Sequence, residues 1–170
     1  MANNGKYVAL TGGVLTEESA VNTSAGAGDA SKLAKLDAAG RFDVTMMPVG
    51  TDIAATTITT SEALSAGDFV NIWNSTGVKA RKADATVAGK EAHGYVLAAY
   101  GTPVAATVYF DGINTGLSGL TVGARQFLST TAGGRTETAP STAGNVDQIL
   151  GVAISATAAI FRPNDPILVA

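Results

Sequence analysis

The chain has 170 residues, a length that fits one domain or one domain with an appendage. Hydrophobic residues make up 46% of it, whereas charged residues make up only 15%, below the roughly 25% of soluble domains, which favours a surface used in assembly. The net charge of −3 argues against a nucleic-acid-binding surface, and the lack of cysteine excludes disulfides and thiolate metal sites.

The first 50 residues differ in composition from the rest of the chain and predict an extended N-terminal arm. Val8-Ala9-Leu10 is a short apolar run, and the residues from Glu17 to Asp29 are small and polar. Such a segment has too little apolar surface to offset the entropy cost of ordering it alone. We therefore expect residues 1–50 to become ordered only against a partner, and residues 51–170 to form the main domain.

One stretch of the arm has a helical pattern. In Asp29–Asp37, Leu33 and Leu36 lie three residues apart and Asp29 can act as the N-cap, so the pattern allows at most one short helix here. Isolated helices of this length are marginal in water. Phe42–Met46 then alternates between apolar and polar residues before Pro48-Val49-Gly50 ends the arm.

From residue 51 onward the pattern predicts strands separated by short turns. β-branched and aromatic residues are dense, and Asp111-Gly112 is a hairpin signal. With almost no helical pattern, these residues predict an all-β fold, a compact antiparallel barrel or sandwich. The expected strands are Ile53–Thr60, Phe69–Trp73, Val78–Ala85, Ala92–Tyr100, Val104–Phe110, Gln126–Leu128, Ile149–Ile154 and Ala158–Arg162.

The predicted β domain contains an internal repeat. Leu64-Ser65-Ala66-Gly67 matches Leu120-Thr121-Val122-Gly123, and each copy continues to a glycine before an apolar run, at Gly94 and at Gly151. Two copies are too few for a solenoid, so we expect one fold built from two related β units, in which Gln126–Leu128 pairs with Ile149–Ile154. Chance similarity between strands rich in glycine and threonine is the alternative.

No constellation of residues in the sequence indicates catalysis. His93 is the single histidine and lies inside an expected strand, where a core or edge position is the simplest interpretation. The 14 acidic residues are scattered, Asp37–Asp43 lacks the ligands of a calcium loop, and Gly26-Ala27-Gly28 lacks the context of a dinucleotide site. We expect a non-enzyme with no catalytic residue, no cofactor and no metal.

Part of the arm resembles a segment of known virion proteins. Within Ala25–Asp43, a small-residue run is followed in order by Gly28-Asp29, Lys32-Leu33, Leu36-Asp37, Gly40 and Asp43, as in virion proteins of tailed bacteriophages. The Leu-Ser/Thr-x-Gly units and their glycine-led return strands are similar to those of the same proteins, particularly capsid decoration (cement) proteins and some head or tail fibres. The likeness covers most of the chain. It implies a homo-oligomer, most often a trimer, that bridges neighbouring major capsid subunits on the outer face of an icosahedral shell.

This resemblance implies that the arm contacts the shell and that the β domain is the rigid body. The apolar residues of the arm are then the capsid-contact candidates: Tyr7, Val8, Leu10, Leu33, Leu36, Phe42, Val44, Met46 and Met47. Packing of these residues on their own β domain is the alternative. The candidates for the interface between copies are Trp73, Ile167, Leu168 and Val169, although Trp73 also fits a core position.

The expected partner is the major capsid protein, with no nucleic acid and no membrane. The first residues lack the pattern of a signal peptide, and no apolar run is long enough to cross a membrane, so we expect synthesis in the host cytoplasm and a place on the outer capsid surface of the virion. A head or tail fibre module that binds host-surface glycans is the second hypothesis, and a free-standing carbohydrate-binding domain the third. Aromatic residues make up only 6% of the chain and are scattered, which favours the decoration protein.

Overall fold

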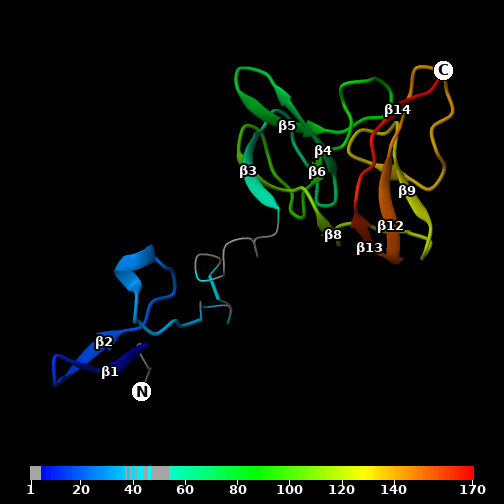
Figure 1. Ribbon diagram of the computed structural model, residues 1–170. Coiled ribbons are helices and arrows are strands. Elements are labelled where there is room, and N and C mark those ends of the chain that lie inside the picture. The colour runs from blue at the N-terminus through cyan, green and yellow to red at the C-terminus, as the bar shows by residue number, and fades with distance from the viewer. Residues whose placement is uncertain (1–4, 37, 39, 41, 44–45, 47–53) are drawn as a thin grey trace. The chain divides into compact units, whose positions relative to one another are not determined.

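A computed structural model describes residues 5–36, 38, 40, 42–43, 46 and 54–170 (Figure 1). The chain divides into two compact units, Met1–Asp52 and Ile53–Ala170, and the sequence-based boundary was placed at residue 50. Regular structure in the described residues consists of β-strands and one 3₁₀ turn. The predicted all-β class is confirmed.

The N-terminal unit begins with a β-hairpin rather than a single extended run. β1 (Lys6–Thr11) pairs antiparallel with β2 (Val14–Ser19), and Lys6 forms an ion pair with Glu17 across the strands. Gly12 and Gly13 join the strands with φ values of +61° and +83°. A two-residue type I′ turn needs positive φ at both positions, which glycine adopts without a steric penalty.

The short helix that the sequence allows over Asp29–Asp37 does not form in the described residues of this stretch. Only the 3₁₀ turn η1 (Gly26–Asp29) forms, and Asp29 accepts hydrogen bonds from the Ala25 N–H (2.6 Å) and the Lys32 ammonium (2.8 Å). Ala34 instead lies beside Val21 in an isolated parallel bridge. Leu33 and Leu36 are both exposed, so a helix here would have no apolar face to bury and too few residues to be stable by itself.

The C-terminal unit starts with a closed barrel. Its strands are β3 (Ala55–Thr60), β4 (Phe69–Asn74), β5 (Val78–Lys82), β6 (Gly94–Tyr95) and β7 (Ala105–Tyr109), in the order β3-β5-β4-β6-β7. All pairs are antiparallel except β3 with β5, which closes the barrel. The strand expected over Ala92–Tyr100 is reduced to two residues.

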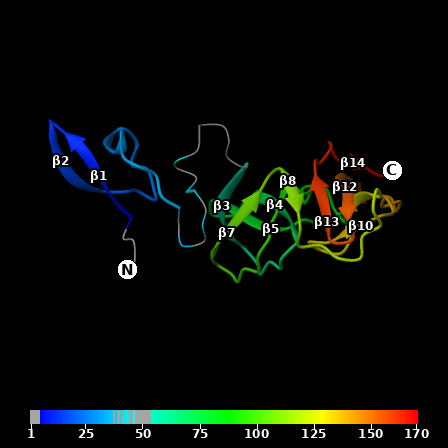
Figure 2. The same cartoon turned by 90° about the horizontal axis from the view of Figure 1, so that it is seen from below.

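A second, open sheet follows the barrel (Figure 2). Its strands are β8 (Gly112–Asn114), β9 (Arg125–Leu128), β10 (Arg135–Thr136), β12 (Ile149–Ser155) and β13 (Ala158–Phe161), in the antiparallel order β10-β9-β12-β13-β8. A separate pair joins β11 (Val146–Asp147) to β14 (Ile167–Leu168). The expected pairing of β9 with β12 is confirmed.

The hairpin expected at Asp111-Gly112 is wrong. β8 pairs with β13 of the second sheet instead of folding back on β7. Gly112 has a φ of +110°, so the glycine redirects the chain from the barrel to the next sheet. A local turn signal therefore marks the crossing between the two halves of the unit.

The two halves are copies of one design, as the sequence repeat predicts. Gly67 donates its N–H to the Val96 carbonyl at 2.8 Å, and Gly123 donates to the Ala153 carbonyl at 2.8 Å. The strand order β5-β4-β6-β7-β3 of the barrel corresponds to β10-β9-β12-β13-β8 of the sheet. Only the pairing of β3 with β5 has no counterpart, which is why the first half closes and the second half stays open.

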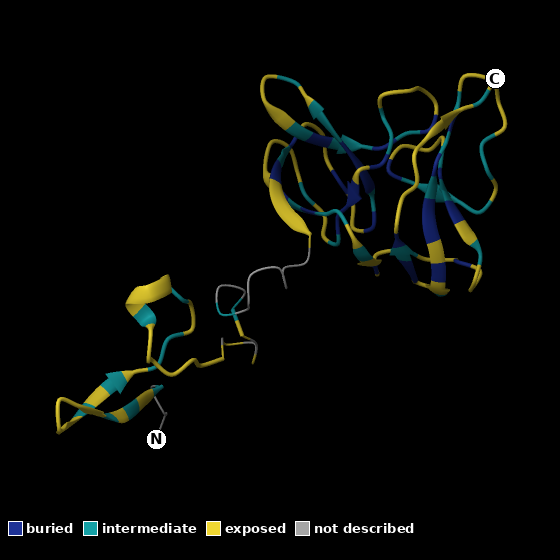
Figure 3. Ribbon diagram, in the orientation of Figure 1, coloured by how far each residue is buried: buried dark blue, intermediate teal, exposed yellow. Residues whose placement is uncertain are grey.

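One core joins the halves. Phe161 of β13 packs against Phe69 and Tyr95 of the barrel, with ring centroids 5.7 and 5.5 Å apart. The buried Gln148 side-chain amide accepts a hydrogen bond from the Ala92 N–H (2.8 Å) and donates one to the Ala92 carbonyl (3.0 Å). It thus bonds to both backbone groups of Ala92, as the backbone of a paired strand does. The C-terminal unit is therefore a single rigid body, and Figure 3 shows its buried residues as dark segments in both halves.

Glu137, in the segment that follows β10, forms hydrogen bonds with the loop before β9. Its carboxylate accepts hydrogen bonds from the Thr121 N–H (2.7 Å) and the Gln126 amide (3.3 Å), and it pairs with Arg135 (3.3 Å). The Thr121 backbone bond is the main reason that the pKa of Glu137 is lowered from its ordinary value of 4.5. The ionised form is the one that the fold favours.

We expect Glu137 to contribute to stability at neutral pH and to lose that contribution in acid. Because its pKa is lower in the folded state, the contribution is complete above the unfolded value of 4.5 and disappears as the pH falls through the folded value. Glu137→Gln should therefore be less stable than the wild type at pH 7, and the difference should shrink in acid. Urea unfolding at pH 7 and at about pH 3 measures this, and an equal difference at both values would contradict the assignment.

Candidate interaction surface of the N-terminal unit

The described residues contain no group of three or more His, Asp or Glu side chains placed to hold a metal ion. His93 is exposed, and its Nδ1 accepts the Ile72 N–H at 3.0 Å. It thereby continues the hydrogen bonding of β4 beyond the end of the two-residue strand β6, which is the edge position considered for this histidine. Among the same residues, none forms a helix with the length and apolarity needed to cross a bilayer.

The hairpin of the N-terminal unit carries apolar side chains that the structure leaves open to solvent. The register places Leu10 opposite Leu15 and Val8 opposite Glu17, so these four side chains lie on one face, with the ion pair of Glu17 and Lys6 at its end. Val8, Leu10 and Leu15 are 67%, 70% and 72% exposed, and we call these three residues the apolar hairpin face. No described residue of this unit is buried, which Figure 3 shows as yellow and teal throughout. The hairpin has no core of its own.

Within the described part of the chain, no strand pairs with the backbone edge of β1 that faces away from β2. The Ala20 N–H donates to the Gly5 carbonyl at 2.7 Å, which fixes the alternation of hydrogen-bonded pairs along the hairpin. By that alternation Val8 and Leu10 direct their backbone N–H and C=O groups away from β2. An open strand edge is a template for pairing with another chain.

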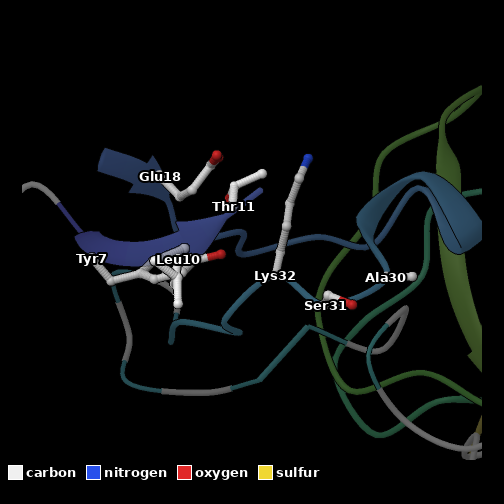
Figure 4. Close-up of a pocket in the computed structure, with 8 residues that line it drawn as sticks. Tyr7, Leu10, Thr11, Glu18, Ala30, Ser31 and Lys32 are labelled. Atoms are coloured by element: carbon white, nitrogen blue, oxygen red, sulfur yellow. The ribbon is translucent and has the colours of Figure 1, made fainter. Parts of the chain in front are cut away.

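The opposite face of the hairpin forms a pocket of about 320 Å³ with residues 30–32 (Figure 4). The strand residues that line it are Tyr7, Ala9, Leu10, Thr11 and Glu18, so Leu10 of the apolar hairpin face also borders the pocket, and Ala30, Ser31 and Lys32 line it from the loop. Asp29 binds the Lys32 ammonium, which raises the pKa of Lys32 and, together with the Ala25 N–H, lowers that of Asp29. Since its cation is already paired, the pocket holds the loop in place and offers little to an anionic ligand.

The capsid-contact candidates fall into separate groups. Val8 and Leu10 lie together on the apolar hairpin face, whereas Tyr7 is half-buried in the pocket on the other side. Leu33, Leu36 and Phe42 are exposed, and Met46 is half-buried. Val44 and Met47 lie outside the described residues. Leu15 was missed, although Gly12-Gly13 between two alternating runs is a hairpin signal that would have found it.

The candidates for the interface between copies are not in one place either. Trp73 is half-buried on β4, and its ring lies under the Arg81 guanidinium at 4.4 Å. Ile167 and Leu168 are exposed on β14, and Val169 is half-buried. Trp73 thus has a partner within its own barrel, while the side chains of the C-terminal tail remain open.

Comparison with known proteins gives no match: no family model, no curated protein and no solved structure is similar to this chain.

Proposed function

We propose that this chain is a structural virion protein that decorates and stabilises a bacteriophage capsid. It lies on the outer capsid surface as a homo-oligomer, in the simplest case a trimer, and bridges neighbouring major capsid subunits without catalysing a reaction. The observation that carries this proposal is the contrast between the two units. The C-terminal unit has a core of its own, whereas no described residue of the N-terminal unit is buried.

The hairpin is suited to binding by strand addition. A two-stranded hairpin is at best marginally stable in water, and a third strand with an apolar surface to cover makes it stable. A strand of the capsid protein that pairs with the open edge of β1 would satisfy the Val8 and Leu10 backbone groups. Full burial of an aliphatic side chain contributes about 1.5–3 kcal/mol, so covering Val8, Leu10 and Leu15 offsets much of the cost of ordering a short segment.

Bridging follows from having several arms on one oligomer. Each arm binds one capsid subunit weakly, and the linked body makes the next binding event intramolecular. The rigid C-terminal unit sets the distance between these contacts. The mechanism therefore needs a flexible binding element and a stiff connector, and it needs no titrating or nucleophilic group.

Glycan recognition by a fibre module is the weaker alternative. Sugar binding uses an exposed aromatic ring as a stacking surface. The Trp73 ring, the one indole of the chain, is covered on one face by Arg81, and its Nε1 donates to Ser61 at 3.1 Å. These contacts favour a structural role for Trp73. Electron microscopy of virus particles separates the two functions, because a decoration protein forms a regular array on the shell and a fibre projects from one site.

We expect loss of shell binding when the apolar hairpin face becomes charged. The full-length double variant Leu10→Asp/Leu15→Asp leaves the glycine turn in place but puts two carboxylates opposite each other, and this face cannot be buried without burying them. Cosedimentation with empty capsids of the phage that encodes the chain should show at least a tenfold loss of bound protein. Val78→Asp, an equally exposed position on β5, is the matched control and should bind normally. Undiminished binding of the double variant, or of a chain without residues 1–47, would remove the arm from the mechanism.

A further inference from the structure

The outward face of the second sheet carries a row of aliphatic side chains. Across the strands, Ile113 of β8 lies opposite Ile160 of β13, Ile160 opposite Val152 of β12, and Val152 opposite Arg125 of β9. Ile113 and Val152 are 46% and 41% exposed. We call the three aliphatic residues Ile113, Ile160 and Val152, together with Arg125, the open row.

The internal repeat shows what the same row does in the first half. There Phe69 lies opposite Tyr95, and Tyr95 opposite Tyr109, in the register that Arg125, Val152 and Ile160 occupy in the second half. Phe69 and Tyr95 are buried because Phe161 and its neighbours of the second sheet cover them. The first half of the C-terminal unit therefore buries the side chains at these register positions, whereas the second half leaves the corresponding residues, the open row, uncovered.

Next to the open row lies a groove of about 290 Å³. Three residues of the open row, Arg125, Val152 and Ile160, line it together with Ile149, Gly151 and a second arginine, Arg162. Both arginines are exposed, and the described part of the chain gives neither an ion pair. An apolar groove between two unpaired cations fits an apolar segment that carries a carboxylate.

The chain has such a segment beside the groove. Asn164 binds the Ile149 backbone twice, through its side-chain oxygen (2.8 Å) and its own N–H (3.1 Å), so the C-terminal tail starts at the groove's edge. Beyond it, Asp165, Ile167 and Leu168 are exposed, and Asp165 has no cationic partner among the described residues. The backbone of Ile167 and Leu168 pairs with β11, so β14 presents these side chains while the strand stays attached to its own copy. One continuous surface thus holds both an arginine-flanked apolar groove and an acidic, apolar tail.

We propose that this surface is where copies of the chain bind one another, with the tail of one copy in the groove of the next. Asp165 of one copy faces Arg125 of the other, and Ile167 and Leu168 cover the open row. Two copies can contact each other reciprocally with β14 of each still paired to β11, or the contact can pass around a closed ring. The ring gives the trimer proposed above, but the contact itself does not depend on a capsid, so it can fail or hold in solution independently of shell binding.

The first test measures self-association of the full chain by sedimentation velocity across a concentration series. Val152→Asp puts a charge into the open row and should raise the dissociation constant at least tenfold, while Val78→Asp on the barrel leaves it unchanged. Circular dichroism and thermal unfolding of each variant establish that the body is folded. A wild type that stays monomeric at every concentration, or association that Val152→Asp leaves intact, overturns the proposal.

The second test asks whether the arginine and the aspartate meet. Arg125→Glu and Asp165→Arg should each weaken association, and the double variant Arg125→Glu/Asp165→Arg should recover most of the loss because the pair is restored with reversed signs. Both positions are exposed, so folding is not at risk. If the double variant associates no better than the single variant with the weaker self-association, the two side chains do not face each other and the tail-in-groove arrangement is wrong.

Discussion

Replacing Gly151 with alanine should prevent the C-terminal unit from folding. A Cβ atom at this position would lie 1.8 Å from the Ile160 carbonyl oxygen and 2.9 Å from its carbonyl carbon, far inside van der Waals contact. The obstacle is backbone, so no rotamer change can relieve it. The φ of Gly151 is +146°, which residues with a side chain rarely adopt, so the substitution is strained even before the collision is counted.

This collision lies at the centre of the second sheet. Gly151 is paired with Phe161 on one side and with Gln126 on the other, in a stretch where the register of β12 shifts. Moving β12 away to make room would break both ladders and open the core between the halves. We therefore expect a loss above about 4 kcal/mol, which is diagnostic of a structural collision.

Soluble expression and circular dichroism measure this effect. Gly101→Ala is the matched control, since its added Cβ would meet nothing within 4 Å, and it should fold like the wild type. A Gly151→Ala variant with unchanged thermal stability would mean that β12 and β13 do not approach as closely as described.

The sequence allowed the β elements and their repetition to be predicted because both depend on short-range patterns. β4 and β7 coincide with runs of β-branched and aromatic residues, β9 and β13 coincide with short apolar runs, and Gly67 and Gly123 of the repeat mark turns with positive φ. Closure of the first half could not be predicted in this way. It depends on a parallel pairing between Thr59 and Lys79, whose side chains carry no signal for it.

The candidate site was predicted less completely, for a physical reason. The apolar residues of the arm were recognised, but their grouping depends on strand register, which puts Val8 and Leu10 on one face and Tyr7 on the other. A short helix was considered because Leu33 and Leu36 are three apart, yet that spacing stabilises a helix only where something covers the leucines. The open row was not anticipated at all, since Arg125, Val152 and Ile160 come together only through pairing of distant strands.

Phe161→Ala should cause the second large loss of stability, about 3–5 kcal/mol, as for other fully buried phenylalanines. The side chain is 1% exposed and contacts rings on both strands that face it, Phe69 and Tyr95. Neither ring can collapse into the space, because Tyr95 also stacks on Tyr109 at 5.4 Å and Phe69 is held by β4. A cavity would remain between the barrel and the second sheet.

The control for this variant is the next residue along the same strand. Ile160 points to the opposite side of β13, where it is half-buried in the open row, so Ile160→Ala should cost the isolated chain much less than Phe161→Ala. Urea unfolding followed by Trp73 fluorescence, which reports on the barrel, and by far-ultraviolet circular dichroism, which reports on both halves, gives the comparison. In the wild type the two signals should change together because one core joins the halves, whereas in Phe161→Ala the second sheet should unfold first. Equal losses in the free energy of unfolding for the two alanine variants would place the main core somewhere other than between the halves. The stiff connector that the proposed capsid bridging requires would then be missing.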